Sequence, residues 1–274
     1  MCSRLARIRS IAEKTNSFCS IALLRVGIVL AFYQLHRPPM SLYQDFDRHF
    51  RETLLLLHTQ QPQVAQKMAA YKYELAYTAA ATLSQPCPVY MVGLKPFAAI
   101  GQEYPDPVPH PAGYHAYIDL AWQSPYPRRA IRLLEWAQRR FSAIDSVRDI
   151  PVSNWYFYRA EDSRQLRKYG LPLIDCSRHH ARILASVQPR VVICVGNSKS
   201  LSAFAGMCKL HGSDISQAVL TPYRERTQLK YLTTDERLIV GLPHLSRYDV
   251  TEEMLTWLED CISKYSPVSA STEA

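Results

Sequence analysis

Continuous apolar runs are the sequence feature that most limits the folds open to this chain. CPVYMVGL at 87–94 and RVVICVG at 190–196 contain almost no polar residue, and RLIVGLPH at 237–244 carries a similar apolar stretch. Strands of this kind are buried on both faces, as in parallel sheets that helices cover on each side. With further strands at 150–160 and 227–232, they predict an α/β fold, a three-layer α/β/α sandwich with a mainly parallel central sheet.

Segments with helical periodicity alternate with these strands. From Leu42 onward, apolar residues recur every three or four positions, and Ser41 precedes them as the expected N-cap. QPQ at 61–63 divides the region up to about Leu83 into two predicted helices. Further helices are predicted at 128–141, 177–188, 197–210 and 250–265, the first of them burying Ile131, Leu134 and Phe141.

The two ends of the chain differ from the part between them. The apolar stretch at 21–35 is interrupted by Arg25, is short for a bilayer span and is not followed by a signal cleavage site. We therefore expect 1–39 to be a poorly ordered leader or an over-extended start, with a membrane anchor as the alternative. The remainder predicts a single domain at 40–265 and a disordered polar tail at 266–274.

Cysteine usage and charge narrow the cellular setting. The seven cysteines are odd in number and form no CxxC pair, which favours a reduced, cytoplasmic compartment without a disulfide framework. The net charge of +8 favours an acidic partner. Five of these net charges fall within 1–39, so a local basic patch would be stronger evidence than the total.

A long loop is predicted after the strand at 87–94. It runs from Lys95 to Pro127 and contains seven prolines, and loops of this length in compact domains are functional or disordered. Its aromatic residues argue against disorder and are expected either to cover the core or to form a stacking platform. These residues are Phe97, Tyr104, Tyr114, Tyr117, Trp122 and Tyr126.

Polar residues follow several of the predicted strands. In open α/β sheets, ligands bind beyond the carboxyl ends of the strands. Lys95 follows the first strand, Asn154 lies near the end of the second, and a His-Leu-Ser-Arg run from His244 follows the last. We expect these side chains to converge at one rim of the sheet.

At these positions the sequence resembles the uracil-DNA glycosylase superfamily. GLKPF at 93–97 is similar to its first motif, a strand ending in Gly-x-x-Pro, and HLS at 244–246 to its His-Pro-Ser motif, with leucine replacing proline. PVSNWYFYR at 151–159 resembles the middle segment, in which an Asn ends a central strand. QPRVVICVGNSKSLSAF at 188–204 resembles the strand and helix that follow it, and order and spacing match over Val89–Trp257.

The resemblance implies that a DNA base is flipped into a pocket and that its N-glycosidic bond is hydrolysed. Asn154 would bind the base edge beside the turn at Gly93, and Phe97 would stack on the base. His244 would donate to the base oxygen that gains negative charge as the bond breaks. The phosphate-binding residues implied are Ser246, Arg247 and Arg159.

Lys95 departs from the family pattern. Many members carry Asp or Asn there to position the attacking water, and some branches place Glu one residue earlier, where this chain has Leu94. The replacement acids in the long loop are Glu103, Asp106 and Asp119, with Asp106 taken as the working choice beside His244 and Lys95. Lys95 itself has three open roles: a phosphate contact, a Schiff-base nucleophile if burial lowers its pKa, or a structural lysine with a solvated amine.

No cofactor is expected. Iron–sulfur branches of the family carry a CxxC and a Cys before the middle-motif Arg, where this chain has Tyr158. The adjacent His179 and His180 point to different sides of a helix and make a poor metal site. GNSKS at 196–200 matches neither dinucleotide-binding nor P-loop patterns.

Two classes of function stay open: a DNA glycosylase, or a catalytically silent nucleic-acid or nucleotide-binding protein on the same fold. The expected partner is DNA, single- or double-stranded, for a monomer without stable membrane association. Arg128, Arg132 and Arg139 share a helical face that is either a phosphate-binding stripe or an ordinary solvated surface. An unrelated α/β hydrolase is a third interpretation, although no GxSxG sequence supports it.

Overall fold

The computed structural model describes residues 40–120, 124–168, 175–224 and 227–265. Contacts divide the chain into two units, Met1–Asp45 and Phe46–Ala274, and of the first unit only residues 40–45 are described. The leader predicted at 1–39 and the tail predicted at 266–274 therefore lie outside the described residues.

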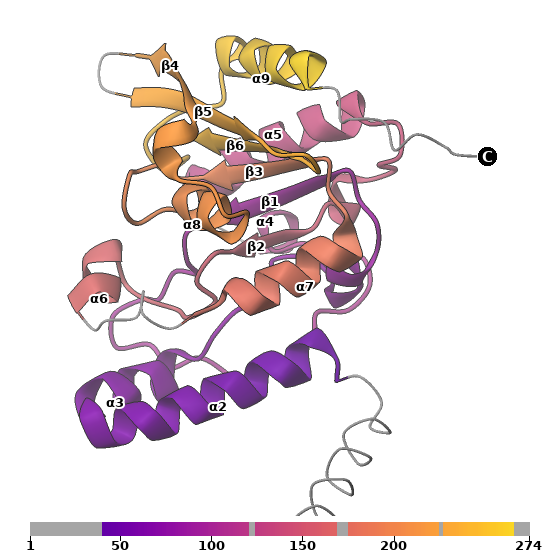
Figure 1. Ribbon diagram of the computed structural model, residues 1–274. Coiled ribbons are helices and arrows are strands. Elements are labelled where there is room, and N and C mark those ends of the chain that lie inside the picture. The colour runs from indigo at the N-terminus through magenta and orange to yellow at the C-terminus, as the bar shows by residue number, and fades with distance from the viewer. Residues whose placement is uncertain (1–39, 121–123, 169–174, 225–226, 266–274) are drawn as a thin grey trace, which may run out of the picture. The chain divides into compact units, whose positions relative to one another are not determined.

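A six-stranded mixed sheet forms the centre of the second unit (Figure 1). In spatial order its strands are β2 (Val152–Asn154), β1 (Val89–Gly93), β3 (Val191–Val195), β6 (Leu238–Leu242), β5 (Thr227–Thr233) and β4 (Val219–Tyr223). The first four are parallel neighbours, whereas β5 pairs antiparallel with both β6 and β4. The α/β class is thus confirmed, and the sheet is mixed.

The antiparallel pairing of β4 with β5 follows from the short connection between these two strands. Only three residues, 224–226, connect β4 to β5. A connection this short can form a hairpin, whereas parallel neighbours need a crossover of a dozen residues or more. The sequence prediction included β5 but missed β4, whose outward residues are largely exposed.

The apolar runs fill the core as predicted. Every residue of β1, β3 and β6 is buried. Helices α7 (Ser177–Val187) and α8 (Ala203–Leu210) lie on the viewer's side of the sheet in Figure 1. Phe204 of α8 packs so closely on β6 that a Cβ atom at Gly241 would lie 2.7 Å from the Phe204 Cγ atom. The bare backbone at Gly241 is therefore part of the helix–sheet contact.

The helices largely follow the predicted pattern. Ser41 caps the first of them, because its Oγ accepts from the Gln44 backbone N–H at 3.2 Å while the Gln44 side chain accepts from the Ser41 N–H at 3.0 Å. That helix is α2 (Leu42–Gln60). Besides α7 and α8, the further helical segments among the described residues are α3 (Pro62–Tyr71), α4 (Ala116–Asp119), α5 (Tyr126–Arg140), α6 (Ser163–Lys168), α9 (Glu252–Lys264) and the 3₁₀ turns Ala80–Ser84, Val147–Asp149 and Ile215–Gln217. None of the described helices is both long and apolar enough to cross a bilayer.

The second helix ends earlier than predicted. It stops at Tyr71 instead of continuing to Leu83, because Lys72 leaves the helical conformation with a positive φ of 57°. Beyond it, the Glu74 N–H donates to the Phe157 carbonyl and the Tyr77 N–H to the Val152 carbonyl. Backbone pairing beside β2 thus replaces the predicted helix.

Two further helix predictions need correction. Ile131 is half-buried and lines a surface groove, while Leu134 and Phe141 are buried as expected. The helix predicted at 197–210 begins only at Ala203, because the Ser202 Oγ accepts from the Ala205 N–H at 3.1 Å and caps it there.

Candidate functional site

A pocket of about 580 Å³ opens at the carboxyl ends of the parallel strands. Gly93 at the end of β1 is in register with Asn154 at the end of β2. The pocket is lined by Tyr77, Leu94, Lys95, Phe97, Tyr117, Ser124, Tyr126, Pro127, Asn154, Glu161, Asp162, His244 and Ser246. The strand-end prediction therefore brings Lys95, Asn154 and His244 to one pocket, which we call the site pocket.

Gly93 and Asn154 are fitted to each other. A Cβ atom at position 93 would lie 2.4 Å from the Asn154 Oδ1 atom, so any side chain there would displace the amide. Asn154 is 3% exposed, and its Nδ2 atom has no hydrogen-bond partner among the described residues. Burial raises the pKa of Tyr77, and the nearby Asn154 amide offsets this in part. A buried donor without a partner is costly, so this Nδ2 atom is available to a polar group that enters the pocket.

Three tyrosines form one wall of the site pocket. The ring centroids of Tyr77 and Tyr117 are 5.2 Å apart, and those of Tyr117 and Tyr126 are 5.7 Å apart. Burial raises the pKa of Tyr126 to about 12 and also raises the pKa values of Tyr77 and Tyr117, so all three remain neutral. Phe97 is 56% exposed and lines the same pocket. Of the six loop aromatics considered from the sequence, Phe97, Tyr117 and Tyr126 line the pocket, and Trp122 lies outside the described residues. Sequence reasoning missed Tyr77, since it placed that residue in a helix.

His244 is held in a defined tautomer. Its Nδ1 atom lies 3.2 Å from the Ser246 backbone nitrogen and 2.7 Å from the Ser246 Oγ atom. Because a backbone N–H can only donate, Nδ1 accepts and the proton of the neutral ring is on Nε2. Burial of the ring, followed by the charges of Arg247 and Lys95, lowers the pKa of His244, although part of the residue reaches solvent. His244 is thus a neutral donor at physiological pH.

The Lys95 amine is enclosed rather than solvated. It donates to the Ala160 carbonyl and, at 3.4 Å, to the Pro96 carbonyl. Burial lowers the pKa of Lys95 to about 8, although the charges of Asp162 and Glu161 act in the opposite direction. This differs from the structural interpretation with a solvated amine, and it places a partly deprotonated amine in the pocket at mildly alkaline pH.

Two acids at the site pocket were missed by sequence reasoning. Glu161 accepts a hydrogen bond from the Tyr71 hydroxyl, which is the main reason that its pKa is lowered. Asp162 accepts from the Gln165 N–H at 2.7 Å at the start of α6. A parallel bridge between Phe97 and Ala160 brings this segment beside the exit of β1. Recognising that LKPF at 94–97 lies beside YRAED at 158–162 would have led from the sequence to these two acids.

The working choice of Asp106 is not supported by its position. Its carboxylate is 87% exposed, pairs with Lys72 at 3.1 Å and does not line the site pocket. Asp119, another of the loop acids considered, pairs with Arg148 at 2.7 Å. Glu103 is exposed and does not line the site pocket either. Glu161 and Asp162, which do line it, therefore replace the loop acids as candidates.

The two arginines assigned to phosphate lie outside the site pocket. Arg159 forms an ion pair with Glu74, donates to the Phe97 carbonyl at 3.2 Å and stacks over the Tyr104 ring at 4.5 Å. These contacts hold it inside the loop structure. Arg247 is exposed and close enough to lower the pKa of His244, so it stays a candidate for phosphate, with Ser246 in the lining.

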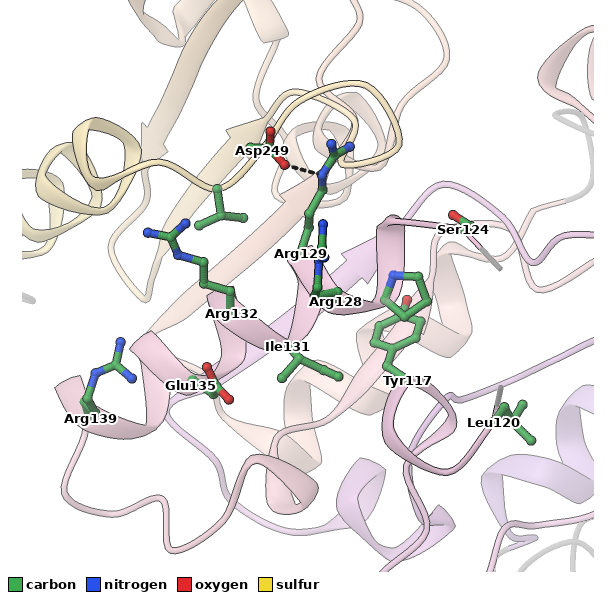
Figure 2. A pocket seen from close by; sticks show the side chains of 12 residues that line it. Tyr117, Leu120, Ser124, Arg128, Arg129, Ile131, Arg132, Glu135, Arg139 and Asp249 are labelled. Atoms are coloured by element: carbon green, nitrogen blue, oxygen red, sulfur yellow. Dashed lines mark hydrogen bonds and ion pairs between the residues drawn. The ribbon is translucent and has the colours of Figure 1, made fainter. Parts of the chain in front are cut away.

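Two other cavities occur in the described part of the chain. One of about 950 Å³ lies beside the N-terminus of α8, and one of about 720 Å³ runs along α5 (Figure 2). The site pocket is smaller than both, but it alone of the three contains the strand-end residues Lys95, Asn154 and His244. Chemistry rather than size therefore selects it.

No group of three or more His, Cys, Asp or Glu side chains is arranged to hold a metal ion within residues 40–120, 124–168, 175–224 and 227–265. The described cysteines (Cys87, Cys176, Cys194, Cys208 and Cys261) are buried free thiols. Comparison with known proteins found no family model and no curated sequence that matches this chain.

Proposed function

We propose that the site pocket binds a base extruded from DNA and that the protein is a DNA glycosylase of the uracil-DNA glycosylase type. The observation that carries the proposal is the buried Nδ2 donor of Asn154, which lacks a partner in a pocket that also contains His244. A uracil-like ring offers acceptors and a donor along one edge, which an amide can match. On this proposal, the sheet and its flanking helices correspond to the three-layer sandwich of that superfamily.

Each wall of the site pocket has a role in this chemistry. The Asn154 amide would read the base edge, and the aromatic rings would enclose the flat faces of the base. The Nε2–H group of His244 would donate a hydrogen bond to the base oxygen on which negative charge grows. Because burial lowers the pKa of His244, the ring would act as a neutral hydrogen-bond donor and would stay uncharged throughout. Asp162 or Glu161 would orient the water that attacks the sugar.

A second function, nucleic-acid binding without turnover, is favoured by one observation. Lys95 occupies the position of the water-activating residue, and two backbone carbonyls hold its amine in place. A largely cationic amine is unfavourable beside a sugar that gains positive charge as the glycosidic bond breaks. On this alternative, the pocket recognises a base and releases it intact.

An excision assay separates the two functions. Single- and double-stranded oligonucleotides with one uracil are incubated with the protein, and abasic sites are revealed by alkaline cleavage. Strand cleavage supports the glycosylase. Uracil-dependent binding without cleavage supports the second function, and equal affinity for uracil-containing and unmodified strands contradicts a base pocket altogether.

Lys95 predicts a further result at abasic sites. The free amine would add to the C1′ aldehyde of an abasic sugar and lose water to form an imine, which borohydride reduces to a stable secondary amine. Because burial lowers the pKa of Lys95 to about 8, the trapped yield should rise between pH 7 and 9 instead of near 10.5. Gel electrophoresis measures the adduct. Lys95→Gln should give none, and the lack of an adduct with the wild type at pH 9 would exclude a nucleophilic role.

A further inference from the structure

The groove along α5 carries a row of arginines, which we call the arginine groove. Its volume is about 720 Å³, and Arg128, Arg129, Arg132 and Arg139 line it (Figure 2). Positions 128, 132 and 139 are four and seven residues apart, so their side chains leave the same face of the helix. Glu135 lies on that face as well, and Asp249 closes one side.

Most of this positive charge is available to a ligand. Arg128 and Arg139 are exposed, and neither side chain is held by a hydrogen bond or ion pair within the described part of the chain. Arg132 pairs with Glu252 at 2.5 Å, but that carboxylate is 82% exposed, and such surface pairs are weak. Arg129 differs, because it is held by Asp249 at 2.5 Å and by the Leu245 carbonyl at 2.7 Å.

The arginine groove adjoins the site pocket. Tyr117, Ser124 and Pro127 line both. In Figure 2, Arg128 lies at the Tyr117 end of the row and Arg139 at the opposite end. At about 1.5 Å per helical residue, the row extends roughly 16 Å away from the mouth of the site pocket.

We propose that the arginine groove binds the sugar–phosphate backbone of the nucleic-acid strand whose base enters the site pocket. A row of guanidinium groups along one helix face suits a linear polyanion, and each fork can bind a phosphate through two hydrogen bonds. A small anion would occupy one end only. The inference rests on the proposed function for the identity of the strand, but it concerns residues that do not touch the base.

The test is a salt titration of strand binding. Fluorescence anisotropy follows a fluorescein-labelled single-stranded 20-mer with one uracil, between 25 and 200 mM KCl. Arg128→Ala/Arg139→Ala removes two phosphate contacts, and each contributes about 0.7 to the slope of log K against log salt for single strands. The slope should therefore become shallower by about 1.4, with affinity at 0.1 M salt falling on the order of 10-fold. An unchanged slope overturns the proposal.

Control variants distinguish an effect of the arginine groove from an effect of total charge or of lost folding. Arg51→Ala/Lys264→Ala removes the same charge away from the groove and should leave the slope unchanged. Glu135→Gln removes the acid between the arginines and should strengthen binding, which a loss of folding cannot mimic. A wild type that binds no oligonucleotide at 25 mM salt overturns the groove proposal.

Two outcomes separate the groove from the site pocket. If the arginine variants weaken binding while no uracil is recognised, the proposed function fails and the groove stands. If uracil recognition is intact and the arginine variants leave the salt slope unchanged, the groove proposal fails and the proposed function stands. Competition by poly-L-glutamate as strong as that by unlabelled oligonucleotide would assign the groove to acidic peptides and overturn the proposal.

Discussion

If the protein is the proposed glycosylase, Asn154→Ala is expected to reduce uracil excision by about 10²- to 10³-fold, the usual effect of losing one preorganised donor from a polar site. If the wild type binds without turnover, the same variant should lose its preference for uracil-containing strands. Stability should not fall in parallel. The Nδ2 atom of Asn154 is buried without a partner among the described residues, and such a group costs about 1–3 kcal/mol in the folded state. Excision rates and urea unfolding midpoints measure both expectations.

Asn197 is the matched control for this variant. It follows β3 as Asn154 ends β2, but its Nδ2 atom donates to the Gln228 carbonyl at 2.6 Å and to the Gly241 carbonyl at 3.0 Å. Asn197→Ala should therefore lower the unfolding midpoint while uracil recognition persists. A large stability loss in Asn154→Ala, with uracil recognition intact, would identify Asn154 as a structural residue and remove the main support for the base pocket.

The parallel half of the sheet could be predicted because its signal is local. Val89–Gly93 and Val191–Val195 are apolar throughout, and only burial on both faces accommodates such strands. Val219–Tyr223 offered no comparable signal, because most of its residues are partly or fully exposed. The segment after Tyr71 was misassigned for another reason. Its extended form depends on hydrogen bonds to the Val152 and Phe157 carbonyls, which no local propensity encodes.

In the candidate site, too, residues placed by local sequence signals could be predicted, whereas residues placed by contacts between distant segments could not. Lys95, Asn154 and His244 could be placed together because parallel strands share one carboxyl edge. Glu161 could not, because its position depends on the bridge between Phe97 and Ala160 and on the Tyr71 hydroxyl. These contacts join segments that are distant in sequence, so residue types alone did not select this acid over Asp106.

Gly206→Ala is expected to lower the free energy of unfolding by about 2 kcal/mol, against the usual effect of the change. In the interior of a helix, alanine is favoured over glycine by roughly 0.5–1 kcal/mol. At this position, however, the new Cβ atom would lie 2.2 Å from the Trp155 Cε2 atom. Overpacking of this kind costs typically about 1–3 kcal/mol, so the steric effect outweighs helix propensity.

The Trp155 ring cannot move aside at low cost. It is 8% exposed and stacks on His180, with ring centroids 4.7 Å apart and planes 7° apart. The Nε2 atom of His180 in turn lies 3.0 Å from the backbone carbonyl oxygen of Trp155. Because Trp155 directly follows Asn154, displacement of the indole should also weaken uracil recognition, even under conditions where the protein remains folded.

Two companion variants isolate the steric effect. Ala205→Gly, one residue earlier in α8, should lose only the propensity difference of roughly 0.5–1 kcal/mol. Gly206→Ala combined with Trp155→Leu should be less destabilised than the sum of the single changes, since the clash is then absent. Urea unfolding of the wild type, Gly206→Ala, Trp155→Leu and the double variant gives the four free energies of this double-mutant cycle. An increase in stability on Gly206→Ala alone would show that α8 does not lie against Trp155 as described.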